Sequence, residues 1–308
     1  MRFSDKSAVG TLGVSVALAA LALAACSSTQ GPGPVASQPG AIRHASISKY
    51  VYATDVGSIK LLVYPAGVPN PTPSSTAVPP KPHGVVTDAN GNVYVASSES
   101  NQIEVYSSGA KTLEYTIQSS SLDKPQGLAI DSAGDLYAAN PDNNTIVEFA
   151  PASSVVVATW TTLASPVGGI ALDNSGLLYA DVSGGAVEQC PALRPSCSTL
   201  TGVVGPENAF GGLAFTPGFI AVGGGSRINY FQVPGWAPGR QNVLYYQQGM
   251  TNRFMTSDSS GTLYIPFAFL GVGHGPPPAI VVVPAAQGVP PSNITAGLSV
   301  PFGAAAGP

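Results

Sequence analysis

Apolar and polar positions follow a repeating pattern along the chain, and residues 124–140 display it most clearly. An apolar run at residues 127–130 leads into a short polar turn, and a second apolar run occupies residues 136–139. The turn contains Asp131, whose side chain can accept backbone hydrogen bonds, and Gly134, which tolerates a positive φ. Short apolar runs bounded by such residues predict a strand–turn–strand unit.

The same unit recurs at a nearly constant interval. Gly127 opens the apolar run in this copy, and the corresponding positions in the other copies are Gly84, Gly169, Gly212 and Phe254, each 42 or 43 residues from the next. Each interval also has room for a third strand (102–106, 145–149, 186–189) and a weaker fourth strand (112–117, 155–160). A period of this length with four strands per unit is typical of β-propeller blades.

The two ends of the repeat region complement each other. Residues 49–55 and 59–64 have the pattern of a second and a third strand, whereas residues 301–306 have that of a first strand. We therefore predict that the C-terminal strand joins the N-terminal blade and closes a ring of six blades, which leaves no inner edge unpaired. The 36 glycines and 29 prolines disfavour helices and support an all-β fold. The sixth unit is longer, with a predicted insertion at residues 267–278.

The shared motif resembles a known repeat. Pro-x-Gly-(apolar)-Ala-(apolar)-Asp-x-x-Gly, followed by an apolar-Tyr pair and a later Asn-x-Ile, resembles the NHL-type β-propeller repeat over residues 47–308. The resemblance implies a six-bladed propeller but no single activity, because that family includes protein-binding, RNA-binding and enzymatic members. Function must therefore be argued from a site.

The N-terminus predicts export. Arg2 and Lys6 precede an uncharged run that ends in small residues, the pattern of a signal peptide spanning residues 1–25. Leu23-Ala24-Ala25-Cys26 resembles a bacterial lipobox, which implies that Cys26 carries acyl chains such as palmitate. A plain secreted form or a membrane-spanning segment is the alternative. Residues 26–46 are rich in Ser, Gly and Pro and predict a flexible tether before a domain at residues 47–308.

These features predict the surroundings of the protein. A lipidated Cys26 makes a membrane the first partner and places the protein in the cell envelope. Ser27 follows this cysteine. By resemblance to Gram-negative lipoproteins, a serine here allows export to the outer membrane, facing the periplasm, if the source is a Gram-negative bacterium. The net charge of −4 and the lack of a basic patch argue against a nucleic-acid partner.

Candidate binding residues lie at one end of the inner strands. In a propeller, the residue before each first strand and the residues after each second strand converge on the mouth of the central channel. The candidates of the first kind are His83, Gln126 and Arg253, and those of the second kind are Asp55, Asn140 and Asp181. An unperturbed histidine titrates near neutral pH, so His83 is a candidate base or ligand, and a hydrogen bond to loop backbone is the alternative.

Other polar residues have structural explanations. The repeated Asp88, Asp131, Asp173 and Asp258 sit inside the turn signature and are interpreted as turn residues. Cys190 and Cys197 lie between the third and fourth strands of the fourth blade, where an oxidising, exported location predicts a local disulfide. No His or second Cys pair accompanies them, so no metal site and no cofactor are predicted.

Together these observations predict a lipid-anchored binding or scaffold module whose ligand, a protein or a small molecule, binds at the channel mouth. The alternative is a propeller hydrolase or lyase similar to gluconolactonase or streptogramin lyase. That resemblance implies acidic, Asn or His residues at the mouth, often with a divalent metal. Glu is absent from the positions before the inner strands, which argues against a metal-dependent lactonase.

Overall fold

The computed structural model describes residues 48–162, 166–192, 195–206, 212–225, 227–243, 250–269, 277–285 and 290–308. All of its strands lie in one compact unit, Ala45–Pro308. Cys26, the predicted signal peptide and tether, Gly211 and most of the predicted insertion, with His274, lie outside the described residues. Within them the one helical element is the 3-10 turn η1 (Ser183–Gly185), and no helix there is long and apolar enough to cross a membrane.

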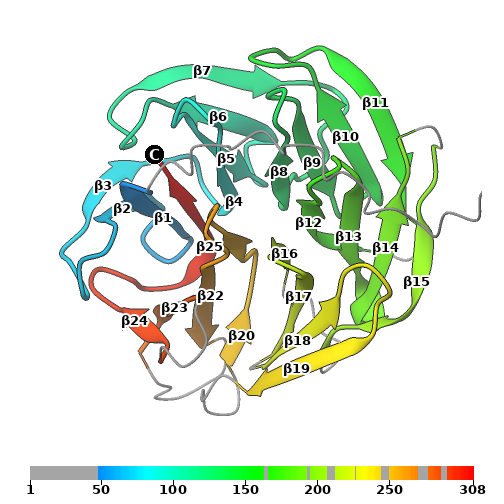
Figure 1. Ribbon diagram of the computed structural model, residues 1–308. Coiled ribbons are helices and arrows are strands. Elements are labelled where there is room, and N and C mark those ends of the chain that lie inside the picture. The colour runs from blue at the N-terminus through cyan, green and yellow to red at the C-terminus, as the bar shows by residue number, and fades with distance from the viewer. Residues whose placement is uncertain are drawn as a thin grey trace, which may run out of the picture. The chain divides into compact units, whose positions relative to one another are not determined.

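Six antiparallel sheets surround a common centre, as Figure 1 shows. From the inner strand outward, blade one consists of β25 (Pro301–Gly307), β1 (Tyr50–Asp55), β2 (Lys60–Pro65) and β3 (Ser74–Ala77). Blade two consists of β4 (Pro82–Thr87), β5 (Val93–Ser97), β6 (Gln102–Tyr106) and β7 (Leu113–Gln118). Blade three consists of β8 (Leu128–Ile130), β9 (Leu136–Asn140), β10 (Thr145–Phe149) and β11 (Val156–Thr161).

Blade four consists of β12 (Val167–Leu172), β13 (Leu178–Val182), β14 (Ala186–Cys190) and β15 (Ser198–Val204). Blade five consists of β16 (Leu213–Thr216), β17 (Phe219–Gly224), β18 (Arg227–Gln232) and β19 (Pro238–Val243). The predicted all-β, six-bladed propeller with four strands to a blade is thus confirmed.

The sixth blade departs from this plan at its inner strand. Two short strands, β20 (Met250–Asn252) and β21 (Thr256–Ser257), both pair with β22 (Leu263–Phe269). The outer strands of this blade are β23 (Ala279–Val283) and β24 (Ser292–Ile294). The break between β20 and β21 contains Arg253 and Phe254, so the chain leaves regular strand geometry where it reaches the ring centre.

The C-terminal strand closes the ring as predicted. Strand β25 pairs antiparallel with β1, with Ala53 opposite Ala304, and so supplies the inner strand of the N-terminal blade. On its other side, the amide of Ala304 donates to the carbonyl oxygen of Phe254 at 3.3 Å. The first and sixth blades are therefore joined by backbone as well as by side chains.

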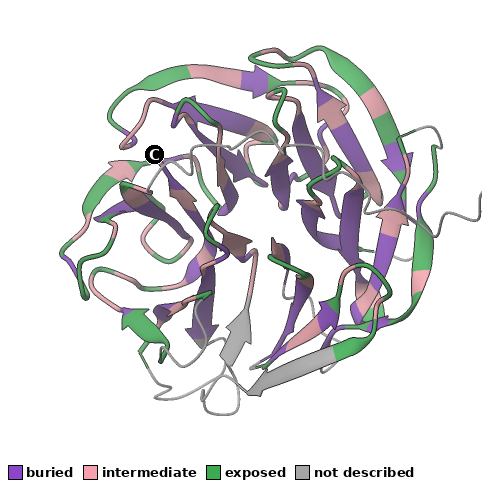
Figure 2. Cartoon of the chain, in the orientation of Figure 1, coloured by how far each residue is buried: buried purple, intermediate pink, exposed green. Residues whose placement is uncertain are grey.

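Hydrophobic cores lie between the blades. Six buried clusters are present, and each combines side chains of two neighbouring blades, so that every junction of the ring has its own core. Tyr52, Tyr64 and Phe149 are among the largest side chains that are fully buried. Figure 2 shows that burial concentrates on the inner and middle strands, whereas exposed positions follow outer strands such as β7 and β11. Stability thus depends on contact between blades, since a lone four-stranded sheet would leave both faces in water.

The repeated aspartates are turn residues, as the sequence indicated. One carboxylate oxygen of Asp173 accepts hydrogen bonds from the amides of Ser175 (2.8 Å) and Leu177 (3.0 Å). The other accepts the hydroxyl of Tyr179 at 3.2 Å, and Asp258 binds Tyr264 in the same way at 3.1 Å. Asp173 and Asp258 therefore each hold a turn together and satisfy the polar end of a buried tyrosine.

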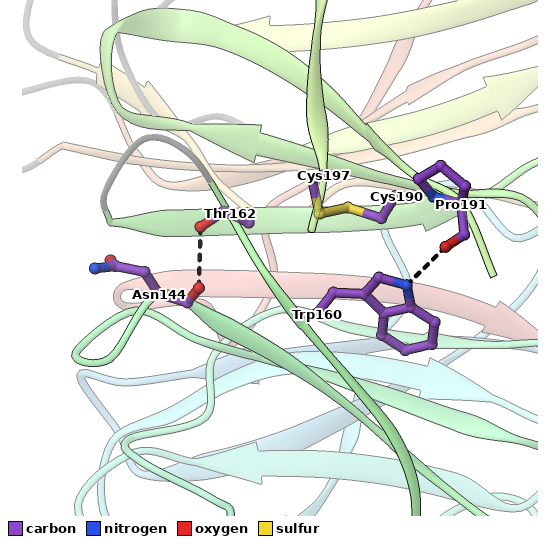
Figure 3. The surroundings of a disulfide bond; sticks show 6 residues. All are labelled: Asn144, Trp160, Thr162, Cys190, Pro191 and Cys197. Atoms are coloured by element: carbon purple, nitrogen blue, oxygen red, sulfur yellow. Dashed lines mark hydrogen bonds between the residues drawn. A yellow bond between two sulfur atoms is a disulfide. The ribbon is translucent and has the colours of Figure 1, made fainter. Parts of the chain in front are cut away.

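Cys190 and Cys197 form the predicted disulfide, with Cα atoms 4.1 Å apart (Figure 3). The loop that they close also lies against the outer strand of the third blade. Trp160 of β11 donates its indole N–H to the carbonyl of Pro191 at 3.0 Å. The amide of Cys197 donates to the carbonyl of Thr161 at 3.1 Å. The disulfide therefore braces the junction of blades three and four as well as its own hairpin.

Replacing both cysteines by serine (Cys190→Ser with Cys197→Ser) is expected to lower the free energy of unfolding by about 2 kcal/mol, because the short loop is no longer closed. Urea denaturation of the variant and of wild type in non-reducing buffer measures this difference. Wild type unfolded with a strong reductant present serves as the control and should resemble the variant. Equal midpoints in non-reducing buffer would contradict a stabilising role for the bond.

Candidate functional site

The innermost ring is formed by backbone atoms of neighbouring blades in direct contact. The amide of Gly84 donates to the carbonyl oxygen of Gln126 at 2.9 Å, and a Cβ atom on Gly84 would lie only 2.3 Å from that oxygen. A Cβ atom on Gly127 would lie 2.4 Å from the carbonyl oxygen of Gly168. The repeat thus requires glycine here because no side chain fits between the blades. The residue before each glycine is correspondingly held at the ring centre.

A cavity of about 360 Å³ opens at this level, at the lower end of the range typical of small-molecule sites. Its lining comes from blades three to six and consists of Gln126, Pro141, Asp142, Pro166, Val167, Gly168, Gly169, Gly212, Arg253 and Phe254. Two of the six predicted candidates, Gln126 and Arg253, are among these residues. They belong to blades three and six, which stand opposite each other in the ring (Figure 1).

Arg253 is positioned by the break in the inner strand of blade six. Its amide donates to the carbonyl of Pro266 at 3.3 Å, and its guanidinium carbon lies 5.3 Å from the centre of the Phe302 ring. That distance is suited to a cation–π interaction, which holds the side chain in place. Burial lowers the pKa of the guanidinium from its ordinary value, and the charge of Asp181 acts in the opposite direction. The group remains charged at any physiological pH.

His83 lies beside the cavity and is absent from its lining. The ring packs edge-on against Phe302 and Phe254, with centroid distances of 4.9 and 6.1 Å, and the residue is 8% exposed. The pKa of His83 is lowered from 6.5 to about 4, mainly by burial and in addition by the positive charges of Arg253 and Lys81. The imidazole is therefore neutral at pH 7 and a weak proton acceptor. Its Nδ1 has no hydrogen-bond partner among the described residues.

Asp55 and Asn140 are fully buried and hold loops in place. The Asp55 carboxylate accepts the amides of Ser58 (2.8 Å) and Ser299 (2.5 Å), which ties the loop before the closing strand to the first blade. Asn140 accepts the amide of Asp123 at 3.1 Å and donates to the carbonyl of Ser121 at 2.8 Å. Neither lines the cavity.

Asp181 is also fully buried, and one of its oxygens accepts the amide of Gly212 at 3.2 Å. Gly212 lines the cavity, so Asp181 supports the wall from behind. Its charge reaches Arg253, as the effect on the pKa of that residue shows. Of the six candidates, Gln126 and Arg253 thus line one cavity. Asp181 and His83 each contact a lining residue, Gly212 and Phe254 respectively. Asp55 and Asn140 bind loops and do not line the cavity.

Several lining residues were missed by the sequence reasoning. Phe254 replaces the repeat's glycine, and this departure was the one available signal for it. Asp142 follows Asn140 in the next loop and forms an ion pair with Lys124 at the mouth. Pro141 and Pro166 contribute apolar surface that no motif marks.

The described residues contain no group of three or more His, Cys, Asp or Glu side chains that could hold a metal ion.

Comparison with known proteins agrees with the fold. No protein-family model matches the sequence, and no curated protein matches it. Similar solved structures include a protein of unknown function from Bacteroides caccae, at 12% identity, over 84% of this chain and 99% of the other, with a TM-score of 0.63. A chain of the nidogen/laminin complex is 17% identical over 83% and 97%, with a TM-score of 0.62. Hydrazine synthase of Kuenenia stuttgartiensis is 11% identical over 75% and 69%, with a TM-score of 0.52.

At such identities the similarity establishes a shared architecture. The chain is a six-bladed β-propeller, a class of fold that suits a binding or scaffold module.

The burial of neutral His83 makes stability depend on pH. In the unfolded chain the imidazole takes up a proton below about pH 6.5, whereas in the folded chain it stays neutral to about pH 4. Unfolding therefore binds a proton in this window. The free energy of unfolding should fall by up to roughly 3 kcal/mol from this group as the pH drops from 6.5 to 4.

Urea denaturation at several pH values between 4 and 7 checks this for wild type and for His83→Gln. The variant lacks the titrating group, so its stability should fall less steeply over the same range, while both proteins share the background of carboxylate titration. Parallel curves for the two proteins would show that His83 is not held neutral.

Proposed function

We propose that the protein is a lipid-anchored propeller of the cell envelope that binds a small ligand at the mouth of its central channel. The observation that carries the proposal is the cavity of about 360 Å³ with Gln126 and Arg253 in its lining, on opposite blades. Neither side chain has a hydrogen bond to another protein group among the described residues. Apart from Asp142, which is paired with Lys124, the other lining residues are glycine, proline, valine and phenylalanine. A few available polar groups in such a lining are what a small-molecule site requires.

The cavity favours a small molecule over a protein partner as the ligand at this mouth, because a space of this size encloses a compact molecule. The resemblance of the repeat to the NHL type and the shared fold with a chain of the nidogen/laminin complex support binding as the general role. Binding is preferred to the hydrolase or lyase alternative because His83, the expected base, lies outside the cavity lining and is a weak base at neutral pH.

A cavity-filling substitution tests the binding site. Gln126→Trp places a large ring in the cavity and keeps the backbone oxygen that bonds to Gly84. Gln118→Trp introduces the same ring on the exposed outer strand β7 and is the matched control. Both variants and wild type are screened by thermal shift against sugars, amino acids and small organic acids. Compounds that stabilise wild type and Gln118→Trp but not Gln126→Trp are expected.

Compounds that stabilise all three proteins equally would place binding elsewhere, and an absence of stabilising compounds for wild type would argue against a small-molecule site. A loss of folded structure in Gln126→Trp is detected by its melting curve, and Gln126→Phe then replaces it as the smaller cavity-filling variant.

Substitution of the proposed lipidation site tests the anchor. Cys26→Ser removes the thiol that would carry the acyl chains, so the protein is expected to move from the membrane fraction to the soluble or unprocessed fraction. Fractionation of bacteria that express each form, with mass spectrometry of the mature N-terminus, measures this. Ser27→Ala is the control and should remain in the membrane fraction with an acylated Cys26. A Cys26→Ser protein that stays processed and membrane-bound would exclude lipidation as the anchor.

A further inference from the structure

We propose that the cavity selects ligands with a single carboxylate, which binds the guanidinium of Arg253, and with a hydrogen-bonding group that reaches Gln126. This inference rests on the proposed function and names the class of ligand for that site.

Arg253 is a half-buried charged group that forms no ion pair with another described residue. Its Nε is buried and has no hydrogen-bond partner, and no carboxylate lies within ion-pair distance of it among the described residues. Burying a charge is costly unless it is paired, so a bound anion would relieve that cost. The stacking on Phe302 keeps the guanidinium oriented before a ligand arrives. Arginine presents a planar fork of donors, which matches a carboxylate.

The surrounding charges set the charge of the ligand at one. His83 is neutral at pH 7, so Arg253 is the one side-chain cation near the lining that is not already in an ion pair within the described residues. Lys124 and Asp142 form an ion pair, so their charges cancel, and the carboxylate whose charge acts on Arg253 is Asp181. A monoanion can pair with the one remaining cation, Arg253, whereas the second negative charge of a dianion such as phosphate would have no cation of its own.

The lining across the ring from Arg253 indicates which groups the ligand carries besides its carboxylate. Gln126 stands on the blade opposite Arg253 and offers both an amide donor and a carbonyl acceptor. The rest of the lining includes Gly168, Gly169 and Gly212, which have no side chains, together with the apolar residues Pro141, Pro166, Val167 and Phe254. A flat apolar body can therefore lie against the glycine backbone, with a polar group at each end.

Matched pairs of acids and amides test the inference. The probes are 4-hydroxybenzoate, which has a carboxylate, a flat body and a distal hydroxyl, and its neutral analogue 4-hydroxybenzamide. Calorimetric titration of the full mature domain should show that wild type binds the acid at least tenfold more tightly than the amide. Arg253→Gln should remove that preference, and Arg253→Lys should restore part of it because it restores the charge without the fork. Arg227→Gln, on the exposed side of β18, is the control and should bind like wild type.

A direct readout avoids reliance on variants that fold poorly. The Nε–H resonance of Arg253 in ¹⁵N-labelled wild type should shift on titration with 4-hydroxybenzoate and stay in place with 4-hydroxybenzamide or with inorganic phosphate. Equal affinity for acid and amide, or acid binding that survives in Arg253→Gln, overturns the inference while leaving the binding function standing. An unmoved Arg253 resonance in the presence of the acid also overturns it. If the wider thermal-shift screen finds cavity ligands that are all neutral, the inference fails and the proposed function holds.

Discussion

Backbone atoms of neighbouring blades touch around the ring centre, and this steric contact governs the rest of the molecule. Gly84 and Gly127 face carbonyl oxygens of the next blade at distances that leave no room for a Cβ atom. The six inter-blade cores can form only because the inner strands approach this closely. Where the glycine is kept, side chains that differ between blades are thereby confined to the residue before it and to the loops beyond, and in blade six Phe254 takes the glycine position.

The same close packing explains the electrostatics of the mouth. Arg253 and His83 are held near each other with Phe302 against both, so neither side chain can move away from the other's field. The arginine retains its charge, whereas burial in the first place, and the charge of Arg253 in the second, keep the histidine neutral. Arg253 is therefore the charged group of this pair and His83 the neutral one, and this difference determines which charge a ligand in the cavity meets.

Much of the fold could be predicted from the sequence, because a propeller repeats its local rules. The period of 42 or 43 residues set the blades, and the unmatched strand patterns at the two ends indicated the closure by β25. Asp173 was correctly interpreted as a turn residue, and Cys190 with Cys197 as a disulfide. The contact of the disulfide loop with Trp160 was not predicted, since it joins two blades and no periodicity within a blade encodes it.

The site was predicted only in part. Position in the repeat placed Gln126 and Arg253 at the mouth, but it placed Asp55 and Asn140 there equally. Buried polar groups need hydrogen-bond partners, and the partners of Asp55 and Asn140 lie in adjacent loops. Which loop groups are in reach depends on the conformation of the loops, and the position of a residue in the repeat does not specify it. Phe254 lines the cavity and stands where the other repeats have glycine, so the shared motif could not indicate its role. The lipid anchor at Cys26 remains a prediction from the sequence.

The interrupted inner strand of blade six has one more consequence. A ring of six identical blades would present the same surface from each blade to the central channel. A molecule bound at the centre could then adopt several orientations of equal energy. The break between β20 and β21 places a cation and an aromatic residue on the blade-six side of the mouth, whereas blades four and five contribute glycines to the lining. It therefore removes the rotational symmetry of the mouth and gives an asymmetric guest a single way to lie.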